Sequence, residues 1–428
     1  MWKVLSVLFT GIIVSFYYFP FEFTFLPGLN TKMGLAVVGI ILAISNLIKK
    51  KELYFPNNIV SITSLAAIVS LVGIISVIVN NTSDYAYATY FVSMFVWLSG
   101  AYTVCSLIKK VNNELTVENV TIYITCVCVV QCILALIIDS NLEFKSLVDT
   151  FIIQNQEFLS EVDRIYGIGA SLDTAGVRFS ACLLLLVYFI NKRKTSMTNI
   201  QLFLSFLACL IIVILGNMMA RTTIVGVGLS VLYFVLIFKP TRISYAFIRF
   251  FKVVMLSLII VVPLSHFLYA NNLQFHELIR FAFEGFFNLV ETGEWQIDSG
   301  DKLITMIVFP NNLPTWLIGD GYFSNPYNLD PFYVGPLVEG YYMGTDIGYC
   351  RFIFYFGLIG LFAFSCFFIM VAKECIKVLP EYKMLILFIL LLGFVIWMKV
   401  ATDVFFAFAL FLCIGNMQDD PQLLETES

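Results

Sequence analysis

The chain has 428 residues, of which 60% are hydrophobic and 13% are charged, and its mean hydropathy is +0.91. This composition excludes a soluble globular domain, in which about 25% of residues are charged. The formal net charge is −4, and the acidic residues gather in loops, which does not suit binding to nucleic acid. Apolar runs recur along the sequence, and each is long enough for a helix that crosses a bilayer. They predict an all-α polytopic membrane protein.

About twelve apolar segments are candidate membrane spans, and together they make residues 1–428 a single integral membrane domain. The first segment lacks a signal-peptide cleavage site, so we expect it to remain as the first membrane helix. The last two are short and lie close together, which leaves eleven spans as an alternative. The expected spans are 4–19, 33–48, 58–79, 86–108, 117–138, 171–190, 199–216, 222–238, 246–268, 347–371, 384–398 and 402–415.

Basic residues in the short connections predict the orientation, because Lys and Arg beside a span resist translocation. Most of the 25 basic residues fall in alternate connections, which we expect to be cytoplasmic together with both termini. The opposite face would then carry two long connections, 139–169 and 269–346. The basic residues of the expected cytoplasmic side are Lys3, Lys49, Lys50, Lys51, Lys109, Lys110, Lys192, Arg193, Lys194, Lys239, Arg242, Arg249, Lys252, Lys373, Lys377 and Lys383.

The second long connection, 269–346, is strongly acidic and lies between the ninth and tenth expected spans. Apolar residues repeat at helical spacing from Phe275 to Leu289, which predicts an amphipathic helix lying on the membrane. Arg280 on its polar side either contacts a substrate or belongs to the solvated face of a lid. A second short helix is expected near Asp301 to Phe309, and the motifs NNLP, GDGY and NPYN predict irregular backbone beyond it.

Four arginines are expected at the outer ends of spans, or just inside them: Arg164, Arg178, Arg221 and Arg351. A guanidinium is always charged and offers a planar fork of donors, so converging arginines suit a pyrophosphate better than a neutral ligand. The alternative is that each arginine reaches the lipid headgroups or pairs with a nearby acid such as Asp163 or Asp173. We predict that the four line one cavity that opens outward.

Asp346 is the leading candidate for a carboxylate that accepts a proton from a hydroxyl nucleophile, ahead of Asp173, Asp320 and Glu339. It lies five residues before Arg351, where the long connection enters the membrane. The alternative is that Asp346 only caps the following helix.

Metal binding and cofactors are not expected. Glu161 and Asp163 have the ExD spacing of some metal-dependent glycosyltransferases, but such short acidic matches are common by chance. The ten cysteines form no CxxC pair and lie mostly in apolar runs, which favours small buried residues over metal ligands or disulfides.

Four stretches of the sequence carry a resemblance to a known family: RIYGIGASLDTAGVRFS, NMMARTTIVGVGLS, WLIGDGYF and TDIGYCRFIFYFGLIGL. From Arg164 onward the chain resembles the bacterial O-antigen and capsule polymerases called Wzy, relatives of the O-antigen ligases. The resemblance implies a GT-C-like, metal-independent glycosyltransferase of the bacterial inner membrane whose active site faces the periplasm.

The resemblance also implies the substrates. Such an enzyme transfers a growing glycan from an undecaprenyl-pyrophosphate donor to the terminal sugar of a second lipid-linked repeat unit, and a chain-length regulator protein is a further expected partner. The family's outer-face arginines would match Arg164, Arg178, Arg221 and Arg351. Ligases typically carry a histidine near the end of the long loop, where this chain has Asp346, which favours a polymerase. An O-antigen ligase and a transporter for an anionic solute remain the alternatives.

Overall fold

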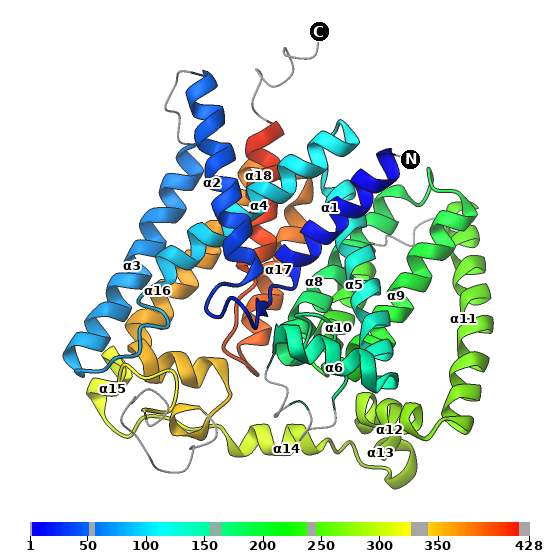
Figure 1. Cartoon of the computed structure of the whole chain (residues 1–428). Coiled ribbons are helices and arrows are strands. Elements are labelled where there is room, and N and C mark those ends of the chain that lie inside the picture. The colour runs from blue at the N-terminus through cyan, green and yellow to red at the C-terminus, as the bar shows by residue number, and fades with distance from the viewer. Residues whose placement is uncertain are drawn as a thin grey trace. The chain divides into compact units, whose positions relative to one another are not determined.

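Figure 1 shows the computed structural model of the protein, which describes residues 2–50, 56–154, 159, 164–237, 245–326 and 341–418. The described residues are almost entirely helical, as expected. The one sheet among them is a ribbon of two-residue strands, β1 (Glu22–Phe23) and β2 (Ile152–Ile153), which pair antiparallel. The chain divides into two units, and each is described by itself below.

The first unit comprises residues 1–35 and 104–296. Its central helix is α8, against which α5, α9 and α10 pack. In the apolar stretch of α8, 72% of the residues are buried. The close approach of α10 to α8 requires Gly226, because a Cβ there would lie 2.3 Å from the Cα of Ser180. Its helices are α1 (Trp2–Tyr18), α5 (Val117–Ser140), α6 (Leu142–Phe151), α8 (Leu172–Arg193), α9 (Asn199–Met219), α10 (Thr223–Ile237), α11 (Tyr245–Asn271), α12 (Leu273–Ala282) and α13 (Glu284–Thr292).

The second unit comprises residues 36–103 and 297–428. Its central helix is α16, against which α3, α15, α17 and α18 pack. Two helices, α2 (Thr31–Lys50) and α4 (Tyr90–Asn112), belong mostly to this unit. Its other elements are α3 (Asn57–Val79), α14 (Asp298–Thr305), α15 (Leu313–Ile318), the 3-10 turn η2 (Tyr342–Gly344), α16 (Gly348–Val378), the 3-10 turn η3 (Pro380–Tyr382), α17 (Lys383–Ile396) and α18 (Phe405–Gln418).

Helix α16 is broken near its first third. Gly357 adopts φ 67° and ψ −172°, a conformation that is essentially restricted to glycine. The break frees carbonyl groups to which the loop after α15 then donates. The backbone N–H of Asp320 donates to the oxygen of Phe354 at 2.6 Å, and that of Gly321 donates to the oxygen of Tyr355 at 3.1 Å. Irregular backbone inside a membrane helix is tolerated where such partners exist.

Every expected span falls on a helix, and eight helices are long and apolar enough to cross a membrane. They are α2, α3, α4, α5, α8, α9, α11 and α16, whereas α1, α10 and α18 are apolar but shorter. The protein is therefore a multi-pass membrane protein, and the count of twelve spans stays a prediction. None of the ten cysteines forms a disulfide, and all are buried except Cys126, Cys209 and Cys366.

The long connections differ from the expectation in three places. Two short helices, α12 and α13, replace the single amphipathic helix expected at 275–289, because the backbone leaves the helical conformation at Phe283. The NNLP motif, expected to be irregular, begins α15, and Asn312 caps it by accepting from the backbone N–H of Thr315. The connection 139–169 contains α6, which was not expected. The helix expected near Asp301 is present as α14.

Candidate functional site

The amino end of α8 and the turn between α9 and α10 lie in contact in the first unit. Gly176 on α8 permits this contact, since a Cβ there would lie 2.8 Å from Cβ of Thr222. The hydroxyl of Thr222 donates a hydrogen bond to the carboxylate of Asp173. Ser171 holds the N-cap position of α8, and its side chain makes no capping bond. The turn thus brings Arg221 to the end of a helix whose dipole favours anions.

Arg164 and Arg221 converge on one aromatic ring, that of Phe281 on α12. The Cζ atom of Arg221 lies 3.8 Å from the ring centroid, and that of Arg164 lies 4.9 Å from it. The Nε atom of Arg221 also donates to the carbonyl oxygen of Phe281 at 3.0 Å. Stacking on an aromatic face orients a guanidinium and leaves its edges for ligands. Two of the four predicted arginines are therefore neighbours.

Arg164 holds a hydrogen-bond donor with no acceptor among the described residues. Its Nε atom is buried there without a hydrogen-bond partner, as are the Nε atoms of Arg178 and Arg351. Burial lowers the pKa of Arg164, while the carboxylate of Asp173 opposes this shift. A guanidinium nevertheless remains protonated at neutral pH. Arg164 is therefore a mostly buried positive charge whose Nε–H has no acceptor among the described residues. An anionic ligand would satisfy both.

Arg178 and Arg221 are held by groups of the protein itself. The Nη1 atom of Arg178 donates to the carbonyl oxygen of Thr174 at 2.9 Å, so its guanidinium turns back toward the amino end of α8. The Nη2 atom of Arg221 lies 2.7 Å from a carboxylate oxygen of Glu284 on α13. Three of the predicted arginines therefore belong to one end of the first unit, and a carboxylate of α13 partly neutralises one of them.

Arg280 lies on α12 but makes its contacts within the amphipathic pair of helices. Its two terminal nitrogens each donate to one oxygen of Glu291 at 2.7 Å, and its Cζ lies 5.0 Å from the ring centroid of Phe287. These hydrogen bonds raise the pKa of Arg280 and lower the pKa of Glu291. The pair favours the interpretation of Arg280 as part of a lid, and contact with substrate stays a prediction.

Arg351 lies in the second unit, on the first turn of α16, and its side chain is only 4% exposed. Its Cζ atom lies 3.6 Å from the ring centroid of Phe323 and 3.5 Å from that of Tyr341. Its Nη2 atom donates to the carbonyl oxygen of Phe323 at 3.1 Å. The guanidinium is thus enclosed between two aromatic rings. The cavity predicted to contain all four arginines stays a prediction.

Asp346 is half-buried and interacts electrostatically with Arg351. The residue at the N-cap of α16 is Ile347, which corrects the alternative that Asp346 caps this helix. Its interaction with Arg351 is compatible with the predicted role as a proton acceptor, which stays a prediction. Of the other carboxylates considered from the sequence, Asp320 accepts from the hydroxyls of Thr315 and Tyr342 at 2.5 and 3.0 Å. Glu161, Asp163 and Glu339 lie outside the described residues.

The sequence did not single out Asp84, a buried carboxylate of the second unit. Its Oδ2 atom accepts from the backbone N–H groups of Phe323 and Ser324 at 2.8 and 2.9 Å, and its Oδ1 accepts from that of Ala86. Asp84 therefore fixes the backbone that carries one of the two rings around Arg351. Its only sequence signal is an acid in a short connection between two spans.

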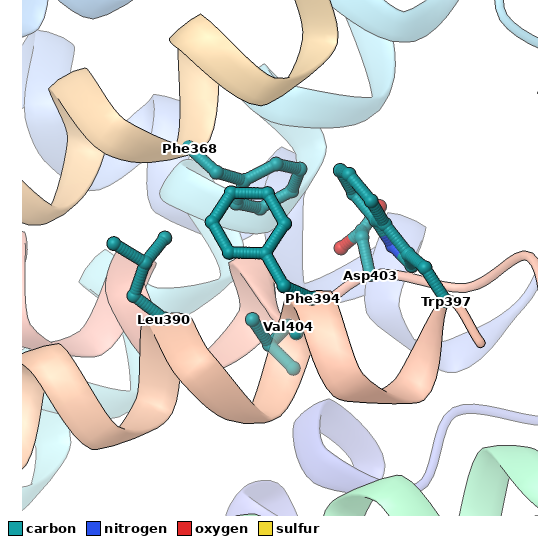
Figure 2. A pocket seen from close by; sticks show the side chains of 7 residues that line it. Phe368, Leu390, Phe394, Trp397, Asp403 and Val404 are labelled. Atoms are coloured by element: carbon teal, nitrogen blue, oxygen red, sulfur yellow. The ribbon is translucent and has the colours of Figure 1, made fainter. Parts of the chain in front are cut away.

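Asp403 was also missed, and it borders the space shown in Figure 2 between α16 and α17. Phe368, Phe394 and Trp397 line this space, which does not admit a water molecule. The Oδ1 atom of Asp403 accepts from the backbone N–H of Phe405 at 2.9 Å, at the start of α18. This region is packed core, and Asp403 has a structural role there.

No protein-family model matches the sequence, and no curated protein or solved structure shows significant similarity to the chain.

Proposed function

We propose that this protein is a membrane glycosyltransferase that polymerises lipid-linked oligosaccharide repeat units at the outer face of a bacterial inner membrane. The donor is a glycan on a polyprenyl pyrophosphate, as the resemblance to the Wzy polymerases implies, and the acceptor is the terminal sugar of a second lipid-linked unit. A chain-length regulator is the expected protein partner. The fold is expected to be GT-C-like, with both termini in the cytoplasm.

The observation that carries the proposal is the convergence of Arg164 and Arg221 on the ring of Phe281, beside the amino end of α8. Charge builds on the bridging oxygen when a pyrophosphate departs, and fixed guanidinium groups stabilise that charge best where water is scarce. The unused buried Nε–H of Arg164 provides one donor for this oxygen or its neighbours. Arg178 turns toward the same helix end and adds a third positive charge.

The proposed reaction needs one proton acceptor and no redox partner. The acceptor hydroxyl oxygen forms a bond to the anomeric carbon while the bond from that carbon to the pyrophosphate oxygen breaks. The electron pair leaves with the pyrophosphate, and the hydroxyl proton passes to a carboxylate, for which Asp346 is the candidate. Attack opposite the leaving group inverts the configuration at that carbon.

The test is polymer formation by the purified protein from a lipid-linked oligosaccharide, read as a ladder on a gel. Replacing Arg164 with Lys keeps the charge but removes the planar fork of donors. We expect the rate to fall roughly 10²-fold, the cost of removing one donor to a developing oxyanion. The matched control is Arg193→Lys, because Arg193 lies in the last turn of the same helix as Arg178, at its opposite end. This control should polymerise at the normal rate.

Two results would contradict the proposal. The first is a full polymer ladder from a folded Arg164→Lys variant, which would remove the arginine site. The second is the absence of any ladder from the wild-type protein with several lipid-linked donors. If the wild type instead drives uptake of an anionic solute into proteoliposomes, the protein is a transporter.

A further inference from the structure

A groove with a volume of about 530 Å³ lies between α9 and α11 in the first unit. Its apolar wall consists of Phe203 on α9 with Val253, Leu256 and Ile260 on α11. The three α11 residues recur at intervals of three and four, so they form a continuous stripe along one side of that helix. In the apolar stretch of α11, only 6% of the residues are buried, so most of this helix surface does not pack against the rest of the protein. An apolar helix that buries so little of its surface is expected to face lipid, and the groove runs beside it.

Two positive charges stand at one end of this groove. Arg249 and Lys252 come from the first turns of α11 and line it together with Asn199, the first residue of α9. Nε of Arg249 donates to the side-chain oxygen of Asn199 at 2.5 Å, and its Nη2 donates to the carbonyl oxygen of Met197. Both partners are neutral. They hold the guanidinium in place without cancelling its charge.

No carboxylate compensates these charges within the part of the chain that the structure describes. The lining of the groove contains no acidic side chain, and neither Arg249 nor Lys252 takes part in an ion pair there. A basic end joined to an apolar channel at a membrane surface fits a molecule with an anionic head and a hydrocarbon chain. The two residues belong to the basic connection expected to face the cytoplasm, whose leaflet carries anionic lipid.

We propose that this groove is a binding site for one anionic phospholipid. The phosphate lies between Arg249 and Lys252, and one acyl chain follows Phe203, Val253, Leu256 and Ile260. The positively charged group of a zwitterionic lipid would be repelled by Arg249 and Lys252, so the site selects a headgroup with a net negative charge. The proposal goes beyond the transferase reaction, because this basic end belongs to the helix ends opposite the turn that holds Arg221.

The test measures retention of lipids by the purified full-length protein in detergent, using native mass spectrometry with phosphatidylglycerol and phosphatidylethanolamine. The wild type should retain phosphatidylglycerol preferentially. The double variant Arg249→Gln with Lys252→Gln should bind it roughly 30-fold more weakly, because each of the two basic groups near a membrane surface contributes about 1 kcal/mol. The matched control is Lys110→Gln, a basic residue in the last turn of α4, outside the groove. This control should keep the preference.

Two further measurements test the roles of the apolar wall and of the acyl chain. Phe203→Trp narrows the apolar channel and leaves both charges, so it should also weaken phosphatidylglycerol binding. Glycerol 3-phosphate at millimolar concentration should not displace the lipid, since it lacks the acyl chain. Equal retention of the two lipids by the wild type would overturn the proposal, as would an undiminished preference in the folded Lys252→Gln variant. Displacement by glycerol 3-phosphate alone would reduce the site to a phosphate site.

Discussion

Arginines that look alike in the sequence have different environments in the structure. Arg164 and Arg351 each have a buried Nε–H with no acceptor among the described residues, but Arg164 shares the ring of Phe281 with Arg221. Arg351 is enclosed by the rings of Phe323 and Tyr341. The guanidinium of Arg351 therefore lies between two rings, whereas those of Arg164 and Arg221 share one. The hydropathy pattern predicted that these residues stand near span ends, but it carried no information on which rings cover them.

The first prediction concerns Asp346. If its carboxylate accepts the proton of the attacking hydroxyl, Asp346→Asn should slow polymer formation roughly 10²- to 10⁴-fold, the usual contribution of a general base. Donor binding should persist, because Asn keeps the shape and most of the hydrogen bonds of Asp. The measurement is the rate of ladder formation together with the affinity for the lipid-linked donor.

The control for Asp346 is Glu294→Gln, which removes an exposed carboxylate from the same long connection. This variant should form a normal ladder. A normal ladder from Asp346→Asn as well would show that the attacking hydroxyl is activated without this carboxylate. Loss of donor binding together with loss of rate would assign Asp346 a role in positioning Arg351 instead.

At the scale of single elements, the helix pair α12 and α13, predicted to act as a lid, carries Glu284, whose carboxylate lies 2.7 Å from Arg221. A pyrophosphate that binds Arg221 must displace this ion pair. We therefore predict that Glu284→Gln lowers the KM for the lipid-linked donor by up to about fivefold, which corresponds to the strength of a partly exposed ion pair. Steady-state kinetics at low ionic strength measure this change.

Glu291→Gln provides the comparison, since it breaks the pair with Arg280 in the same lid but leaves Arg221 untouched. The KM should stay at the wild-type value if Arg280 only shapes the lid. An unchanged or raised KM in Glu284→Gln would exclude competition between this carboxylate and the donor.

The broken helix α16 gives a prediction about stability. A Cβ atom at Gly357 would lie 2.2 Å from the backbone of Leu317 on α15, and the φ of 67° is unfavourable for any residue with a side chain. Gly357→Ala should therefore lower the free energy of unfolding by at least about 2 kcal/mol. The midpoint of thermal unfolding in detergent should fall by several degrees.

Gly228 on α10 is the matched control, because a Cβ there meets nothing within 4 Å and its φ is ordinary. Gly228→Ala should leave the midpoint unchanged or raise it slightly, since Ala is the better helix former. An unaltered midpoint in Gly357→Ala would mean that α16 is continuous rather than broken.

The helices could be predicted from the sequence, whereas the contacts between distant segments could not. Runs of apolar residues predicted the eight helices that are long and apolar enough to cross a membrane, because this property depends on composition and length alone. The break at Gly357 was not predicted, since glycine is common in membrane helices and the reason for the break lies forty residues upstream, at α15. Asp84 was missed for the same reason. Its partners, Phe323 and Ser324, are more than two hundred residues away in the chain.

For the whole molecule, the number of crossings depends on short helices. α17 and α18 have 14 residues each. At 1.5 Å per residue such a helix covers about 21 Å, less than a hydrocarbon core of about 30 Å. They cross only if the bilayer thins or if the extended chain around them completes the passage. Composition alone therefore left eleven and twelve spans as alternatives.

The last prediction is the topology, with both termini in the cytoplasm and twelve crossings. Three expected crossings separate Glu294 from Ser428, so reporters at these positions should lie on opposite sides. Alkaline phosphatase inserted at Glu294 should be active, and green fluorescent protein fused after Ser428 should be fluorescent. A third reporter at Thr402, between α17 and α18, decides whether these short helices cross, because it should lie outside only if each of them spans the membrane. A cytoplasmic Thr402 would leave the two helices as a re-entrant pair, and Glu294 on the same side as Ser428 would refute the orientation derived from the basic residues.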